Sequence, residues 1–390
     1  MRVTEPAAPV AAAPPRSAPM RPWLRRGLIA LGCALGIALN CYLELPSLSR
    51  VLPSDNDFMG FYAGAQLAGS RDLYSFEALL RAESRVSELP HFVPFVRWPV
   101  YAAAISPLRF FDYRPAYWIW QTISAAAVLL FVWFWPAPRK WMTAMACCWS
   151  LPLLNNFLVG QDVPVIMLAL AVSMALFFRG RHFAAGCVFS LCLIKYNLFL
   201  PIPLLIAGKR LWKFGGGVAA GVGALVAMSF AVGGWSWPWR YAAMLRLPGT
   251  TPSYSGMPNL HGVFSGLPHG GLWEAAGTCA TLAAVWLVIR RGEIAAAVSA
   301  ALAGGLAVSY HAFFADASIL APACLLLLSR ASGLPLRLAA TLLLCPIAYL
   351  PFWMDSRFPP ALLLSLPLLA MAAEQIRPRA KAEQPLPWKP

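Results

Sequence analysis

The chain has 390 residues, of which 59% are hydrophobic and only 12% are charged. Soluble proteins carry about 25% charged residues, so a water-soluble enzyme and a nucleic-acid-binding domain are excluded. The 31 basic and 16 acidic residues give a net charge of +15, which in a membrane protein reports basic cytoplasmic loops. The nine cysteines lie in apolar stretches without a CxxC pair and predict small core residues, not disulfides or metal ligands.

The chain begins with a stretch rich in Pro and Ala, residues 1–22, which predicts a disordered tail. The first apolar run, residues 24–45, begins among Arg21, Arg25 and Arg26. It is too long for the core of a signal peptide and no A-x-A site follows it, so we interpret it as a retained signal anchor.

Further membrane spans follow from the length of the apolar runs, since about 20 apolar residues cross a bilayer. On this measure we expect spans at residues 115–136, 140–157, 162–179, 211–233, 271–290, 293–309, 314–330, 334–353 and 358–376.

Two segments do not fit a simple span. Residues 182–208 are too long for one span and hold Lys195 in the middle, where a charge at the bilayer centre is costly. They predict a hairpin of two short helices with Lys195 near its outer tip. Residues 98–112 are short, contain Pro107 and end in charged residues, which favours an interfacial helix.

The positive-inside rule selects this arrangement. The predicted fold is an all-α polytopic membrane protein with about 12 transmembrane helices, external juxtamembrane helices and both termini in the cytoplasm, including the tail 377–390. The cytoplasmic side then receives the basic clusters Arg139/Lys140, Arg179/Arg181, Lys209/Arg210/Lys213, Arg290/Arg291 and Arg330/Arg337.

This topology leaves two large external segments, residues 46–114 and 235–270. The first holds seven of the sixteen acidic residues, and the second is rich in Trp, Pro and Gly. Loops of this length in a compact protein are usually functional, so we expect the polar chemistry on the external face.

Asp55 and Asp57 follow the first span. A carboxylate held just above a membrane can act as general base on an acceptor hydroxyl. The commoner use of an Asp before a helical segment is to cap the helix, and spacing alone favours the cap.

Lys195 also has two interpretations. An ammonium at the membrane boundary can bind a lipid-linked phosphate as a point charge, or it can belong to a lysine that snorkels at a helix end.

His311 and Asp316 lie at an external junction, and Gln161 and Asp162 open a span. His311 can donate to a phosphate and Asp316 can bind a sugar hydroxyl, or both can face water. Asp162 can cap its helix. The sequence contains no HExxH, P-loop or GxSxG motif, so neither a metal nor a cofactor is implied.

An ordered series of short motifs runs through the chain, and the set resembles glycosyltransferase family 87, among the polytopic C-superfamily (GT-C-like) enzymes. The motifs are DFMGFYAGAQLAGSRDLY (57–74), RWPVYAAAISPL (97–108), VGQDVPVIMLAL (159–170), LCLIKYNLFLPIPLLIAGKRLW (191–212), MPNLHGVFSGL (257–267) and SYHAFFADASILAPACLLLL (309–328). The family's Tyr-Pro-Pro is replaced by Trp98-Pro99-Val100, and its Lys-Pro-Gln by Lys195-Tyr196-Asn197.

The resemblance implies a catalytic transmembrane domain over residues 23–376. It implies that a carboxylate of the first external loop is the catalytic base, and Asp57 falls on the motif, with Asp55 as the alternative. Lys195 and His311 would bind the donor phosphate. The substrate-binding residues would be Asp316, Gln161, Tyr62, His261 and Asn259.

The implied activity is that of an inverting hexosyltransferase in a bacterial plasma membrane. It would move a sugar, mannose by resemblance, from a polyprenyl-phosphate donor to a glycan, lipid or protein hydroxyl on the external face. Membrane lipids are its other partners, and no nucleic acid is expected. The alternatives are a flippase for lipid-linked sugars or another transporter, and an assembly subunit with an inactive site.

Overall fold

The computed structural model describes residues 21–51, 56–87, 92–247, 256–329, 333–352 and 361–376. All regular structure in these ranges is helical, which confirms the predicted all-α class. Residues 1–20, the predicted tail 377–390 and Asp55 lie outside the described residues.

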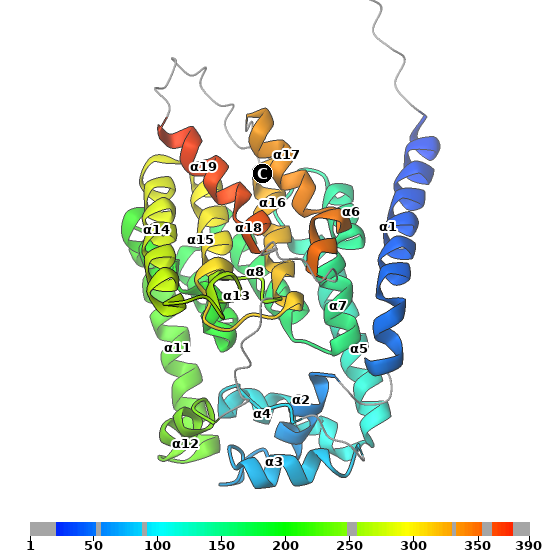
Figure 1. Ribbon diagram of the computed structural model, residues 1–390, viewed down its shortest axis with the longest axis vertical. Helices are drawn as coiled ribbons and strands as arrows, with labels where there is room; N and C mark the ends of the chain where they lie inside the picture. The colour runs from blue at the N-terminus through cyan, green and yellow to red at the C-terminus, as the bar shows by residue number, and fades with distance from the viewer. Residues whose placement is uncertain are drawn as a thin grey trace, which may run out of the picture.

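The helices form a tall bundle with a layer of short helices at one end (Figure 1). The bundle consists of α1 (Pro22–Val51), α5 (Tyr113–Phe134), α6 (Lys140–Trp149), α7 (Leu151–Val159), α8 (Val163–Phe178), α9 (His182–Phe189), η2 (Ser190–Phe199), α10 (Ile202–Gly208), α11 (Trp212–Gly233), α14 (Gly270–Arg291), α15 (Ile294–Val308), η3 (Phe314–Ile319), α16 (Leu320–Leu328), α17 (Leu334–Leu343), η4 (Pro346–Phe352), α18 (Ala361–Leu364) and α19 (Leu366–Ile376). The end layer consists of α2 (Phe58–Gln66), α3 (Phe76–Glu83), α4 (Pro99–Ile105), η1 (Ser106–Phe110) and α12 (Trp237–Met244), and α13 (Leu260–Phe264) precedes α14.

Five helical segments in the described part of the chain are long and apolar enough to cross a membrane, and two bent helix pairs raise the number to seven. The pairs are α6 with α7, bent by 63°, and α17 with η4, bent by 60°. The protein is therefore an integral membrane protein. Other predicted spans coincide with shorter helices such as α8 and α15, of 16 and 15 residues. At 1.5 Å per residue these reach about 22 to 24 Å, short of the roughly 30 Å hydrocarbon core, so twelve spans stay a prediction.

The segment 182–208 turns back on itself. The rings of Phe189 and Phe199 lie 5.4 Å apart, whereas ten residues of a continuous helix would separate them by about 15 Å. The helical backbone is broken at Lys195, with φ −114° and ψ 55°. Both ends of the segment reach α11. The ring of His182 packs edge-on against Phe177, which contacts Phe214, and Ile206 lies against Gly215. These contacts agree with the hairpin predicted from the position of Lys195, and the break at Lys195 interrupts one of the five candidate spans, His182–Phe199.

The interfacial interpretation of residues 98–112 also agrees with the structure. The segment forms the seven-residue α4 and the five-residue η1, which together are too short to cross a membrane. It lies in the end layer beside α2 (Figure 1).

Close packing of α9 against α11 holds the first arm of the hairpin. A side-chain Cβ on Gly217 would lie 2.0 Å from the carbonyl oxygen of Phe183, and one on Gly186 would lie 2.0 Å from that of Phe214. Only glycine allows two backbones to approach so closely, a common device between membrane helices.

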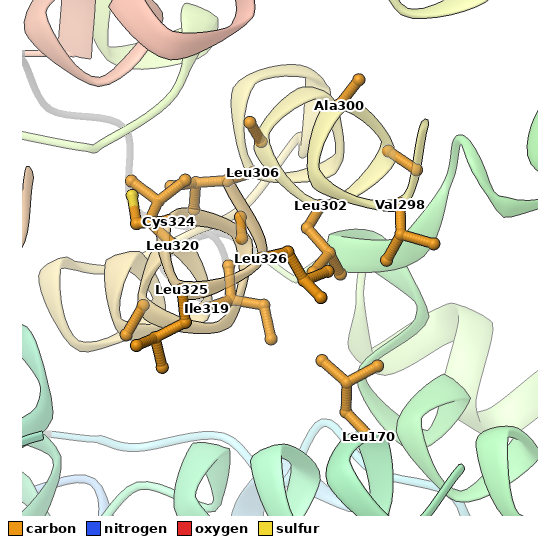
Figure 2. Packing of buried hydrophobic residues seen from close by; sticks show 14 of the residues in the cluster. Leu170, Val298, Ala300, Leu302, Leu306, Ile319, Leu320, Cys324, Leu325 and Leu326 are labelled. Atoms are coloured by element: carbon orange, nitrogen blue, oxygen red, sulfur yellow. The ribbon is translucent and has the colours of Figure 1, made fainter. Parts of the chain in front are cut away.

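Two apolar cores stabilise the fold. In the bundle, Leu170 of α8 faces Val298 and Leu302 of α15 and side chains of α16 such as Leu326 (Figure 2). The second core lies in the end layer and is aromatic, with Phe58, Phe61, Tyr74, Phe95, Tyr101, Trp120 and Trp237 among its members.

The two ends of the described chain lie at the same end of the bundle, opposite the end layer (Figure 1). Arg291 of α14 donates to the carbonyl oxygen of Gln375 in α19, and Lys209 donates to that of Gly292. Basic loops and the ends of the described chain thus gather on one side, and the short helices gather on the other.

Candidate active site

A cleft opens where the end layer meets the bundle. Its empty volume is about 920 Å³, open solvent at its mouth included. The polar side chains that line it come from segments far apart in the sequence and are those of Asp57, Arg97, Gln161, Lys195, Tyr196, Asn197, Tyr241, Tyr310 and His311.

Asp57 takes the position before α2 that a capping residue would take, yet its carboxylate makes no capping hydrogen bond. Instead Oδ2 accepts a hydrogen bond of 2.6 Å from Nε2 of Gln161. The capping interpretation is therefore wrong for the side chain. Asp57 lines the cleft, and the residue is partly exposed.

Gly160 brings Gln161 to Asp57. Its backbone is left-handed, with φ +70°, a conformation that glycine adopts without a steric penalty. A Cβ at this position would lie 2.6 Å from Cβ of Phe58, so only glycine allows the loop after α7 to approach the start of α2. The carbonyl oxygen of Gly160 accepts from the indole of Trp120, 2.9 Å away, which holds the loop in place.

Behind the cleft, Arg97 and Asp162 form a buried, two-pronged ion pair. Nε of Arg97 lies 2.7 Å from one carboxylate oxygen and Nη2 lies 3.0 Å from the other. Such paired donors match a carboxylate in geometry as well as charge. Asp162 also stands before a helix, α8, without capping it, so the capping interpretation is wrong here too.

Lys195 joins this pair to the rest of the site. Its ammonium forms an ion pair with Asp316, lies 3.7 Å from Asp162, and donates to Oε1 of Gln161 at 3.1 Å. The lysine is 4% exposed, so it does not snorkel to water. The positive charges of Arg97 and Lys195 balance the negative charges of Asp162 and Asp316. Asp57 adds one more carboxylate beside them.

Burial dominates the electrostatics of Asp57 and raises the pKa of its carboxyl above the ordinary value. The hydrogen bond from Gln161 and the charge of Lys195 oppose this shift. A carboxylate whose pKa is raised in this way is a stronger base.

His311 lies on the opposite side of the cleft from the end layer, in the loop between α15 and η3. Burial lowers its pKa to about 4, so the ring is neutral at pH 7. Its Nδ1 is buried without a hydrogen-bond partner among the described residues. The loop is held by Asn197, which donates to the carbonyl oxygen of His311 and to Oγ of Ser309.

The other predicted site residues are placed differently. Asp316 lies behind the cleft as the partner of Lys195. The hydroxyl of Tyr62 donates to the carbonyl oxygen of Phe111, Asn259 caps α13 and donates to Ser309, and His261 pairs with Glu274 at 2.9 Å. None of these last three lines the cleft, and their role in substrate binding stays a prediction.

Arg97 and the ion-pair role of Asp162 were not predicted. Arg97 opens the motif RWPVYAAAISPL, and its position directly before an apolar helix was the available signal. A single sequence did not reveal its partner because 65 positions separate it from Asp162.

The pair makes a prediction about stability. Arg97→Met should destabilise the protein by about 3–5 kcal/mol, because it leaves the carboxylate of Asp162 buried without its main partner. The double variant Arg97→Met/Asp162→Asn should recover much of this loss. Thermal unfolding in detergent measures both, with Arg85→Met, at an exposed position, as the control. Equal destabilisation in the single and double variants would contradict the pairing.

Comparison with known families gives a match over the part of the chain that carries most of the cleft. A model of glycosyltransferase family 87 matches residues 95–315, more than half of the chain, and this range includes Arg97, Gln161, Lys195 and His311 but not Asp57. No curated protein and no solved structure matches the chain. The family predicted from the motifs is confirmed: the chain belongs to glycosyltransferase family 87.

Proposed function

We propose that this membrane glycosyltransferase moves a hexose, mannose by resemblance, from a polyprenyl-phosphate carrier to an acceptor hydroxyl with inversion at the anomeric carbon. One observation carries the proposal. Asp57 lines the cleft, and Gln161 holds its carboxylate through one oxygen, while the other oxygen accepts no hydrogen bond from a described residue.

In the proposed reaction Asp57 takes the proton of the acceptor hydroxyl as its oxygen attacks the anomeric carbon. The bond from that carbon to the phosphate oxygen breaks, and the electron pair leaves with the lipid phosphate. The proton ends on Asp57 and returns to solvent through the cleft. The raised pKa of the carboxyl suits it to this role.

An apolar cavity beside the cleft supports a lipid-linked donor. It has an empty volume of about 1100 Å³, open solvent included, and lies between α4, η1, α5, α8 and η2. Ile194 borders both the cavity and the cleft. An isoprenoid chain in this cavity would place its phosphate at the cleft.

We propose that Lys195 and His311 receive the donor phosphate. Both border the cleft, and a neutral imidazole such as that of His311 still carries one N–H that can donate to a phosphate oxygen. Lys195 already pairs with Asp316, so the phosphate would share an ammonium that is held in place beforehand. Groups fixed before the reaction stabilise the charge that develops on a leaving group most effectively.

We also propose that the cleft faces the external side, with both termini in the cytoplasm. The basic loops at Lys209 and Arg291 lie at the end of the bundle opposite α2 and α3, and basic loops favour the cytoplasm.

Asp57→Asn should leave the protein folded and inserted yet remove nearly all transfer, because the amide cannot accept the proton. The assay is incorporation of labelled mannose from polyprenyl-phosphate-mannose. In wild type, kcat/KM should fall as the pH drops through the raised pKa of Asp57, since the base must be ionised. Normal turnover by the variant, or an acidic limb at the ordinary aspartate value, would contradict the assignment.

Lys195→Ala should raise KM for the lipid-linked donor by about tenfold or more, the effect of losing one charge-assisted contact, and should change KM for the acceptor much less. His311→Ala should act in the same direction. Donor kinetics at saturating acceptor test both, on protein that gel filtration shows to be folded, because Lys195→Ala also leaves Asp316 buried without its partner. Unchanged donor dependence would count against a phosphate site here.

The topology predicts that a membrane-impermeant thiol reagent applied to intact spheroplasts labels Arg81→Cys but not Arg179→Cys. Both arginines are exposed, the first on α3 and the second after α8. Wild type gives the background from the native cysteines, and permeabilised cells provide the positive control. The reverse pattern would invert the proposed orientation.

A further inference from the structure

We propose that Gln161 is a positioning residue for Asp57 and that Lys195 sets the orientation of its amide. The inference rests on the proposed role of Asp57 as base. It assigns Gln161 to the catalytic carboxylate, whereas the resemblance implied contact with the substrate.

The orientation of the Gln161 amide is determined by its two neighbours. An ammonium can only donate hydrogen bonds and an ionised carboxylate can only accept them. Lys195 therefore contacts the amide oxygen, at 3.1 Å, and the amide nitrogen is left to donate to Asp57, at 2.6 Å. The reversed amide would place two donors together and two acceptors together. The hydrogen bonds from Lys195 through Gln161 to Asp57 therefore allow only one orientation of the amide.

Lys195 can impose this orientation because its own ammonium is held from several directions. Asp316 of η3 pairs with it, and Asp162 lies 3.7 Å away and is itself fixed by Arg97. All four side chains are at most 7% exposed. The break in the helical backbone at Lys195 gives the side chain its place between these groups.

The arrangement leaves Asp57 with one oxygen committed and one oxygen available. Oδ2 receives the Gln161 amide, and the carboxylate makes no capping bond to α2 that would turn it away from the cleft. A carboxylate anchored through one oxygen presents the other in a fixed direction. Misplacement of a reacting group by about 1 Å can cost about 10²-fold in rate, which is the scale of benefit available to such an anchor.

The same hydrogen bond acts on the ionisation of Asp57. Charged or titratable groups face this carboxyl from η2 (Lys195), η3 (Asp316), the segment before α4 (Arg97) and α5 (Tyr113). Removing the Gln161 donor withdraws a stabilising contact from the ionised form, so the pKa of Asp57 must rise.

The experiment compares wild type, Gln161→Met, Gln161→Glu and Asp57→Asn. The control is Gln66→Met, since Gln66 is exposed on α2 and does not border the cleft. Transfer from polyprenyl-phosphate-mannose is measured against pH. Independently of activity, a hydrophobic carbodiimide, which attacks protonated carboxyls, is applied to the purified protein across pH, and label on Asp57 is counted by mass spectrometry.

Gln161→Met should lower kcat by about 10²-fold with little change in KM for the donor, and it should move the midpoint of Asp57 labelling to higher pH. Gln161→Glu keeps an acceptor for Lys195 but can donate to Asp57 only when it is itself protonated. Its activity should therefore rise as the pH is lowered until the two facing carboxyls share one proton, and fall again once Asp57 is itself protonated, whereas that of Gln161→Met should show no such rise. Gln66→Met should match wild type.

An unchanged labelling midpoint in Gln161→Met, or a rise in donor KM without a fall in kcat, would overturn the positioning role and leave Asp57 as base. Full transfer by Asp57→Asn would overturn the proposed base and with it the role of Gln161, whatever the labelling shows. A fold defect in Gln161→Met, detected by gel filtration, leaves the near-isosteric Gln161→Glu and its pH dependence to decide.

Discussion

The rest of the site depends on the burial of four charges, those of Arg97, Asp162, Lys195 and Asp316. A buried charge without a partner costs several kcal/mol, so each of these side chains requires the others. They come from four separate parts of the chain. Their pairing therefore brings together the segment before α4, the start of α8, the tip of the hairpin and η3. This constraint places the cleft where the aromatic core of the end layer meets the aliphatic core of the bundle.

Backbone geometry makes this meeting possible at two points. The left-handed glycine at position 160 lets the loop after α7 contact the start of α2, and the break at Lys195 turns the hairpin so that its tip reaches the cluster. Glycines 186 and 217 then allow the first arm of the hairpin to pack directly on α11. The polar contacts at the tip of the hairpin and the apolar contacts along its arms thus both hold Lys195 in the cluster.

Much of the fold was predictable because it follows from local properties. The lengths of the apolar runs predicted where helices lie. Pro107 and the nearby charges predicted the short segment at residues 98–112, and the cost of Lys195 at the bilayer centre predicted the hairpin. The site was less accessible. Asp57 and Asp162 each stand directly before a helix, where sequence alone predicts a capping side chain. In the structure their carboxylates bind residues distant in the sequence, Gln161 for Asp57 and Arg97 for Asp162. Tyr62 belongs to the motif at residues 57–74, but its hydroxyl donates to the carbonyl oxygen of Phe111. The spacing of residues in the sequence does not predict this contact. The family match supports the glycosyltransferase interpretation over that of a transporter.

The neutrality of the four-charge cluster bears on engineering this enzyme. Replacing a buried ion-pair network by well-packed apolar side chains is often neutral or stabilising, so stability alone does not account for these four residues. On the proposed function they surround the reacting groups, where gains in stability commonly reduce activity. A variant made more robust for structural work is best stabilised elsewhere, in the helical bundle away from the cleft, where the packing shown in Figure 2 involves no residue of the site.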